Sequence, residues 1–201
     1  MKKAIYSLLF IGVLTSCGGE NKTNEEALSG EEHVAIEGIN FPTTLSNDTT
    51  KLVLNGGGVR TVLFIKIYVC GLYLPAKNHD AKSIMEADEP STIRLHVVSR
   101  AFTSERMADV VRTQFEKSNP GRTAEFKTRI DMLCNRLAGE VIQKGDECDI
   151  QYTPNEGIRF FKNGKDINML LSGLDFKQAL WGNWLSNNPA DEEMKKGMLG
   201  L

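Results

Sequence analysis

An arginine and two tyrosines interrupt a long apolar stretch, "GGGVRTVLFIKIYVCGLYL", at residues 56–74. Arg60 stays protonated at physiological pH, so it needs an anionic partner if it is buried. A guanidinium binds a carboxylate through two parallel hydrogen bonds, and the hydroxyl of Tyr68 can add another. Both residues have the same parity on a strand, so their side chains can face one cleft and bind a ligand anion. Tyr73 has the opposite parity, and we expect it to pack in the core, as we do Phe64.

A structural interpretation of the same residues stays open. Arg60 could pair with an internal acid such as Asp109 or lie at an exposed strand start, and Tyr68 could be a core aromatic. Eight residues of straight strand span about 26 Å, too far for one carboxylate to contact both Arg60 and Tyr68. Either the chain bends between Thr61 and Phe64, or the two residues bind different ends of a ligand.

The first 17 residues, "MKKAIYSLLFIGVLTSC", have the pattern of an export signal. Two lysines precede an apolar run that is too short to span a bilayer, which is typical of a secretion signal. The run ends in "LTSC", which resembles a bacterial lipobox, where the cysteine is acylated and the chain is cut before it. We expect residues 1–16 to be a lipoprotein signal peptide and Cys17 the lipid anchor. An ordinary signal peptide with a chance cysteine is the alternative.

A polar, acidic and glycine-containing segment follows, so we interpret residues 17–32 as the acylated cysteine and a flexible tether. Fifteen extended residues would reach up to about 50 Å from a membrane. Gly18 follows the cysteine, with no aspartate there to suggest retention at the inner membrane. These features predict a cell-envelope protein, lipid-anchored in the outer membrane and facing the periplasm.

The composition fits one globular domain, residues 33–201. The chain has 201 residues, 41% of them hydrophobic and 25% charged, which is enough apolar material for a core. The net charge is −2 and no basic block is present, so nucleic acid is not an expected partner.

Periodicity predicts strands, then two helices, then strands and helices again. Strands are expected at 33–42, at 50–58 with a closing glycine turn, at 59–74 as one strand or two, and at 91–100. Helices are expected within 102–121 and 123–145, the second with an apolar stripe that includes Val141. Residues 147–172 return to strands around the hairpin signal Asn163-Gly164, and 174–201 give one helix and a shorter one. This order predicts an α+β fold, an antiparallel sheet with helices on one side.

Three cysteines lie inside the expected domain. Cys70 falls in the apolar strand and reads as a small buried hydrophobe. Cys134 and Cys148 could form a disulfide in an exported protein, but the sequence does not give their separation. There is no CxxC motif and no cluster of cysteine and histidine, so a structural metal site is not expected.

Three segments resemble the chalcone isomerase-like family. These are "LVLNGGGVRTVLFIKIYVCGLYLP" at 52–75, "HVVSRAFTSERMADVVRTQF" at 96–115 and "LDFKQALWGNWLSNNPADEEMKKGMLG" at 174–200. The resemblance runs from about Val34 to Leu201. It implies an open-faced β-sandwich, in which a layer of helices covers one face of a large antiparallel sheet. Members of the family include plant isomerases, fatty-acid-binding proteins and mitochondrial haem proteins.

The resemblance also carries over site residues. Arg60 matches the arginine of the plant isomerases, whereas their strand threonine falls on Tyr68, their tyrosine on Thr103 and their asparagine on Val110. Three of the four polar groups have changed, and Val110 can donate no hydrogen bond. We therefore expect a non-catalytic protein that binds an amphipathic small molecule, a fatty acid or haem-like, through Arg60 and Tyr68.

Two other functions stay open. One is an isomerase, or intramolecular lyase, acting on an unknown substrate through Arg60, Tyr68 and Thr103. The other is a structural envelope protein whose cleft is filled by its own side chains. Haem is a possible cofactor and would need an iron ligand, for which His96, His79, Tyr68 and the methionines are the candidates. His96 shares a strand face with Arg94 and could reach the cleft side of the sheet.

Overall fold

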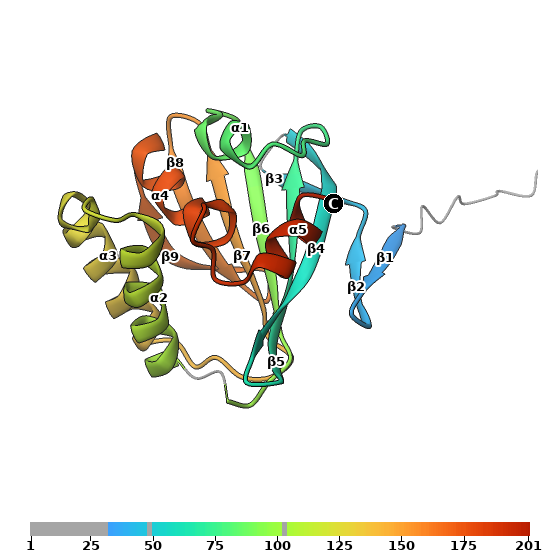
Figure 1. Cartoon of the computed structure of the whole chain (residues 1–201), viewed down its shortest axis with the longest axis horizontal. Coiled ribbons are helices and arrows are strands. Elements are labelled where there is room, and N and C mark those ends of the chain that lie inside the picture. The colour runs from blue at the N-terminus through green and yellow to red at the C-terminus, as the bar shows by residue number, and fades with distance from the viewer. Residues whose placement is uncertain (1–31, 48–49, 102–103) are drawn as a thin grey trace, which may run out of the picture. The chain divides into compact units, whose positions relative to one another are not determined.

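The computed structural model describes residues 32–47, 50–101 and 104–201 (Figure 1). These residues fall within one compact unit, Glu31–Leu201. The expected signal peptide, Cys17 and the tether up to residue 31 lie outside the described residues, as does Thr103.

A seven-stranded antiparallel sheet forms the body of the domain. Its strands pair in chain order, β3-β4-β5-β6-β7-β8-β9, so each strand is hydrogen-bonded to the strand that follows it in the sequence. Their bounds are β3 Thr44–Asn47, β4 Thr50–Val62, β5 Ile65–Leu74, β6 Ser91–Val97, β7 Glu147–Thr153, β8 Gly157–Lys162 and β9 Lys165–Leu171. The hairpin predicted at Asn163-Gly164 joins β8 to β9, and both residues have positive φ, as a two-residue hairpin turn requires.

Five helices are described, and they lie on one side of the sheet (Figure 1). They are α1 Ala81–Glu86, α2 Ser104–Ser118, α3 Thr123–Ala138, α4 Leu174–Leu185 and α5 Glu192–Met198, with α1 at one end of the layer. Within the described part of the chain, no helix is both long and apolar enough to cross a membrane. The predicted α+β architecture, with helices over one face of a large antiparallel sheet, is confirmed.

The main core fills the space between the sheet and the helices. Ile93, Leu95 and Val97 alternate along β6 and are all at least nine-tenths buried, so the face predicted from the sequence is the core face. From the helix side, Phe115 of α2 and Trp181 of α4 are completely buried. The predicted stripe on α3 ends earlier than expected, because the helix stops at Ala138 and Val141 is 74% exposed.

A smaller hairpin covers part of the other sheet face. Residues 33–42 form two strands, β1 His33–Ile36 and β2 Ile39–Pro42, where the sequence had predicted one. The turn between them has φ of 51° at Glu37 and 82° at Gly38. Gly38 adopts its positive φ without steric cost because it has no Cβ atom. Phe41 of β2 packs with Tyr73, whose hydroxyl donates to the carbonyl of Pro42 at 2.9 Å. Tyr73 is therefore a packed residue, as expected.

The three glycines at 56–58 lie inside β4, so the turn predicted at these glycines was wrong. A Cβ atom on Gly56 would lie 2.2 Å from the carbonyl oxygen of Gly197, and one on Gly58 would lie 2.8 Å from the Cα of Met194. These distances are shorter than any real Cβ contact, so only glycine lets α5 rest directly on the strand backbone.

The long apolar stretch turns at Leu63 and Phe64, which have φ of 46° and 69°. It therefore forms two antiparallel strands, β4 and β5, and not one long strand. Phe64 was expected to pack, and that prediction was wrong, because its side chain is 100% exposed at the tip of the hairpin.

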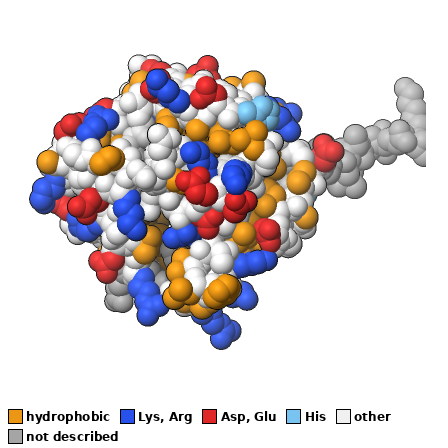
Figure 2. All heavy atoms as spheres, in the orientation of Figure 1, with side chains coloured by type: hydrophobic (Ala, Val, Ile, Leu, Met, Phe, Trp, Pro, Cys, Tyr) orange, Lys and Arg blue, Asp and Glu red, His pale blue; other side chains and the backbone are white. Residues whose placement is uncertain are grey.

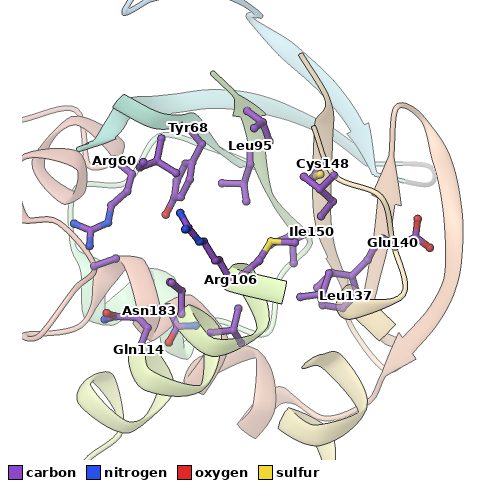
Figure 3. Close-up of a pocket in the computed structure, with 18 of the residues that line it drawn as sticks. Arg60, Tyr68, Leu95, Arg106, Gln114, Leu137, Glu140, Cys148, Ile150 and Asn183 are labelled. Atoms are coloured by element: carbon purple, nitrogen blue, oxygen red, sulfur yellow. The ribbon is translucent and has the colours of Figure 1, made fainter. Parts of the chain in front are cut away.

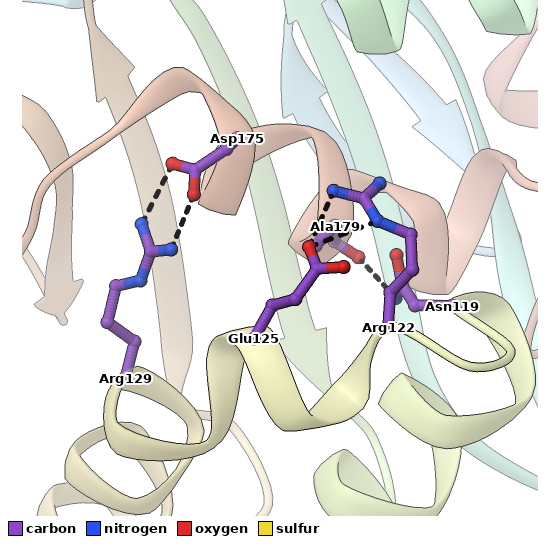
Figure 4. A network of polar contacts seen from close by, with 6 residues as sticks. All are labelled: Asn119, Arg122, Glu125, Arg129, Asp175 and Ala179. Atoms are coloured by element: carbon purple, nitrogen blue, oxygen red, sulfur yellow. Dashed lines mark hydrogen bonds and ion pairs between the residues drawn. The ribbon is translucent and has the colours of Figure 1, made fainter.

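Polar contacts fix α3 against α4 (Figure 4). Arg129 of α3 forms a two-pronged ion pair with Asp175, with nitrogen–oxygen distances of 2.8 and 2.5 Å. The Arg129 guanidinium also lies 4.9 Å from the ring centre of Phe176, a cation–π contact. Asn119, after α2, donates to the carbonyl of Ala179 at 3.1 Å. These contacts connect the helices of the layer directly to one another, in addition to their packing against the sheet.

A buried lysine ties α4 to the end of α1. Lys177 is 1% exposed, and its Nζ donates to the carbonyls of Ile84, Met85 and Ala87 at 2.6, 3.0 and 2.9 Å. Burial lowers the pKa of this ammonium to about 8. The cation therefore satisfies carbonyls that the end of a helix leaves without a partner.

Candidate functional site

A cavity of about 370 Å³ lies between the sheet and the helix layer (Figure 3). Its volume is in the range of small-molecule binding sites. Most of its lining is apolar and comes from the strands and from α2, α3 and α4. The apolar members include Ile67, Leu95, Val97, Met107, Val110, Val111, Leu133, Leu137, Ile142, Ile150, Phe160, Ile167 and Leu180.

The cavity opens beside the β4–β5 hairpin. Leu63 and Val110 line it and are also 85% and 54% exposed, so they mark its mouth between the hairpin tip and α2. Ile150 and Leu180 line it and are almost fully buried, so they mark its inner end. A ligand that enters would meet the hairpin and α2 first.

The hairpin brings Arg60 and Tyr68 together at this mouth. Their Cα atoms are direct partners in the β4–β5 ladder, and both residues line the cavity. Residues opposite each other in an antiparallel pair project on the same face, with Cβ atoms about 5 Å apart. The bend between Thr61 and Phe64 therefore replaces the 26 Å separation expected on a straight strand. One carboxylate can reach both side chains.

Arg60 has an acidic neighbour, but a different one from the acid suggested by the sequence. Its Nη1 lies 3.5 Å from Oδ2 of Asp191, whereas Asp109 is not its partner. The Asp191 carboxylate also accepts from the backbone N–H groups of Glu193 and Met194, where it caps α5, and from that of Thr61. This carboxylate is shared among several donors and its contact with Arg60 is long, so the guanidinium keeps donors for a second anion. The Arg60 side chain is 26% exposed, open to the cavity mouth.

Tyr68 is 8% exposed, and its hydroxyl accepts a hydrogen bond from Nε1 of Trp184 at 3.2 Å. Burial raises the pKa of this phenol well above its ordinary value, so it stays protonated. A protonated hydroxyl can donate to a carboxylate oxygen of a ligand.

A second arginine, Arg106 on α2, was not among the residues singled out from the sequence. It lines the cavity, and in Figure 3 its guanidinium reaches toward the hydroxyl of Tyr68. Its spacing could have revealed it, because Arg106, Val110 and Gln114 are four residues apart and share one helix face. Gln114 and Asn183 also line the cavity, and each already bonds within the protein, to Asn188 and to Ser118.

Of the candidate haem ligands, Tyr68 and Met107 line this cavity, whereas the two histidines do not. His96 lies on β6 between Leu95 and Val97, which line the cavity, so its side chain projects to the opposite face and the expectation that it reaches the cleft was wrong. His79 contacts the carbonyl of Leu199, away from the lining. Among the described residues, no group of three or more histidine, cysteine or acidic side chains could hold a metal ion.

The three cysteines of the domain are free thiols, so the possible disulfide between Cys134 and Cys148 is not present. Cys134 lies on α3 and contacts the carbonyl of Ala108, whereas Cys148 lies on β7 and lines the cavity. Cys70 is completely buried, as expected for a small hydrophobic residue.

Comparisons with known proteins agree with this architecture. The sequence model described as chalcone isomerase-like matches residues 33–200. Among solved structures, a fatty-acid binding protein of Arabidopsis thaliana superposes with a TM-score of 0.68 at 17% identity, covering 84% of this chain and 96% of the plant chain. A search of curated proteins found no match. Because the family match spans most of the chain and the fold agrees with it, this protein is a member of the chalcone isomerase-like family.

Proposed function

We propose that this domain binds an amphipathic small molecule with an anionic head and an apolar body, of the fatty-acid class, and that it does so without catalysis. The observation that carries the proposal is the pairing of Arg60 with Tyr68 at the mouth of an otherwise apolar cavity. The binding function of the Arabidopsis relative supports the ligand class. The ligand carboxylate accepts from the guanidinium of Arg60 and the hydroxyl of Tyr68, and its chain lies along the apolar lining.

Arg106 gives the head group a second cation. It approaches Tyr68 from α2, whereas Arg60 approaches from β4, so a carboxylate beside Tyr68 lies between two guanidinium groups (Figure 3). Val110 stands where the resemblance to the plant enzymes places an asparagine, and it adds apolar surface to the same mouth. This lining favours retention of an aliphatic chain over activation of a substrate oxygen.

The proposed setting is the cell envelope. Acylation of Cys17 would anchor the chain in the outer membrane, and residues 17–32 would tether the domain on the periplasmic side. Cys17→Ser should abolish incorporation of labelled palmitate and release the protein from the membrane fraction. Unchanged fractionation of this variant would contradict the anchor.

The binding experiment uses the compact unit Glu31–Leu201, which contains the whole described core. Lipid extraction and mass spectrometry identify what the purified protein carries, and calorimetric titration with oleate measures its affinity. Arg60→Ala should weaken oleate binding by about 1.5–3 kcal/mol, the contribution of a hydrogen bond to a charged group. Tyr68→Phe keeps the ring and should weaken binding less.

The matched control is Arg122→Ala, which removes the same charge from an exposed site on the helix layer, where Arg122 pairs with Glu125. It should leave oleate binding unchanged. Absence of bound lipid and of oleate affinity in the wild type would refute the proposal. A Soret band after addition of haemin would move the ligand to haem, and turnover of a chalcone-like enone lost in Arg60→Ala would assign the isomerase chemistry instead.

A further inference from the structure

The tip of the β4–β5 hairpin exposes four consecutive apolar side chains. Val62, Leu63, Phe64 and Ile65 are 41%, 85%, 100% and 53% exposed. Scattered single apolar residues are normal on a protein surface, but a continuous protruding group marks an interaction site. The packing of the domain does not explain this group, because Phe64 contributes nothing to either described core cluster.

The turn chemistry does not explain it either. Leu63 and Phe64 both have positive φ, a conformation that disfavours bulky side chains. The same chain makes another turn with two positive φ values at Asn163 and Gly164, the residue pair that such a turn prefers. The β4–β5 hairpin therefore carries its large apolar side chains at a conformational cost that the β8–β9 hairpin avoids.

The surroundings of the tip indicate what it contacts. Val62, Leu63 and Ile65 also line the cavity, so the tip is continuous with the mouth through which the ligand enters. Two exposed cations outside the cavity lie in the adjoining segments, Lys66 on β5, which also pairs with Glu37, and Arg100 after β6. Figure 2 shows apolar side chains at the lower end of the molecule, where Figure 1 places the hairpin tip, with Lys and Arg side chains around them.

We propose that the hairpin tip inserts into the surface of a lipid bilayer that contains anionic lipids, and thereby places the cavity mouth against the membrane. Lys66 is two residues beyond Phe64, about 7 Å along the strand, so it reaches the head groups when Phe64 lies among the upper acyl chains. A protruding apolar tip without hydrogen-bonding side chains fits a fluid apolar medium. The inference rests on the proposed function only for its consequence, that a fatty acid passes from the bilayer into the cavity.

The test is sedimentation of the compact unit Glu31–Leu201, which lacks the expected anchor, with vesicles of phosphatidylcholine and phosphatidylglycerol. Wild type should bind these vesicles and bind pure phosphatidylcholine vesicles more weakly, because the cations then lose their partners. Phe64→Gly should reduce the partition coefficient by about tenfold or more, the effect of removing one inserted aromatic side chain. Leu63→Asn combined with Phe64→Gly copies the Asn163-Gly164 turn and should reduce it further.

Two controls separate membrane contact from misfolding. Glycine is the residue best suited to the backbone at position 64, so Phe64→Gly should unfold at the same urea concentration as wild type or a higher one. Met132→Ser removes an exposed apolar side chain from α3, which is not part of the cavity lining, and should leave vesicle binding unchanged. Equal vesicle binding by wild type and Phe64→Gly would overturn the proposal.

Titration with oleate in the absence of vesicles keeps this inference distinct from the proposed function. Phe64 does not line the cavity, so Phe64→Gly should bind oleate as wild type does. If neither wild type nor Phe64→Gly binds oleate, the proposed ligand is wrong, while the vesicle experiment still decides the role of the tip. Self-association that Phe64→Gly abolishes, without vesicle binding by wild type, would assign the tip to a second copy of the chain and overturn the membrane contact.

Discussion

Arg60 and Tyr68 lie directly opposite each other in the β4–β5 ladder, and the register shifts immediately after Arg60. A shift of this kind bends and twists the strand locally, as a β-bulge does. Upstream of it, six further residue pairs continue the same two strands to Val53 and Leu74. The guanidinium and the phenol are therefore positioned by a long paired segment, and their separation does not depend on a mobile loop.

We predict that Arg60→Ala changes the stability of the ligand-free domain by less than about 1 kcal/mol. The contact with Asp191 is 3.5 Å long and partly exposed, and such ion pairs contribute about 0–1 kcal/mol. Asp191→Ala should cost about 1 kcal/mol or more, because it removes the cap of α5. Urea midpoints of the ligand-free variants test both values. A loss of several kcal/mol in Arg60→Ala would make Arg60 a structural residue and refute its assignment to the ligand.

Lys177→Met should destabilise the domain by about 3–5 kcal/mol. Methionine fills the space of the lysine stem but leaves the carbonyls of Ile84, Met85 and Ala87 without their donor in a buried site. Thermal and urea unfolding measure the loss. Lys82→Met, at an exposed position of α1, is the matched substitution and should change stability by less than about 0.5 kcal/mol. Similar effects of the two substitutions would contradict the role given to the buried ammonium.

Titration of Cys70 should lower the free energy of unfolding as the pH rises above about 9, the ordinary pKa of a thiol. Burial raises the pKa of Cys70 to about 12, so the unfolded chain loses this proton first. The stabilisation is complete below pH 9 and is lost as the pH rises toward 12, with a slope of about 1.4 kcal/mol per pH unit for one proton. Burial also raises the pKa of Tyr68, which adds a loss of the same sign at higher pH.

The control for the alkaline loss is Cys70→Ala. This variant should be less stable below pH 9 because it leaves a small cavity, but its stability should fall less steeply between pH 9 and 10.5. Lys177 has the opposite sign over this interval, since its pKa is lowered to about 8 and the unfolded chain holds its proton longer. The comparison therefore uses the difference between the two pH profiles, in which the lysine cancels. Parallel profiles would show that Cys70 does not titrate as described.

Gly58→Ala should destabilise the domain by about 2–3 kcal/mol, the scale of overpacking against a neighbour that cannot yield. Its Cβ would lie 2.8 Å from the Cα of Met194 and 2.9 Å from that residue's carbonyl oxygen. Gly139→Ala is the control, because a Cβ there meets only ordinary contacts of 3.5 Å or more and the residue has helical φ and ψ. Chemical denaturation should find the control unchanged or slightly more stable. Equal stability of the two variants would contradict the close contact between α5 and the backbone of β4.

Much of the fold was predictable from local patterns. The alternation of Ile93, Leu95 and Val97 identified the core face of β6. The pair Asn163-Gly164 identified the β8–β9 hairpin. Both signals arise from interactions between residues close in the sequence. Arg60 and Tyr68 could be singled out because a cation and a phenol are unusual in an apolar strand. Their direct pairing depended on the turn at Leu63 and Phe64, which carries none of the residues that normally announce a hairpin.

Two of the errors have the same physical cause, which is contact between residues far apart in the sequence. Three consecutive glycines are typical of a turn, but here they admit α5, a helix far away in the sequence. Asp191 was not recognised as the neighbour of Arg60 for the same reason. Phe64 was placed in the core because aromatic residues are usually buried, and only the three-dimensional hairpin shows it at a tip.

The contact of α5 with the glycine backbone of β4 also determines when the domain can finish folding. Strand β4 leaves the ribosome well before α5, the helix that rests on Gly56 and Gly58, because the two elements are far apart in the sequence. Until α5 emerges, one stretch of strand backbone has no cover and Arg60 has no acidic neighbour. Long-range contacts of this kind slow folding. The nascent chain thus leaves this part of β4 uncovered until α5 has been synthesised, so packing of the strand against its helix is a late step of folding.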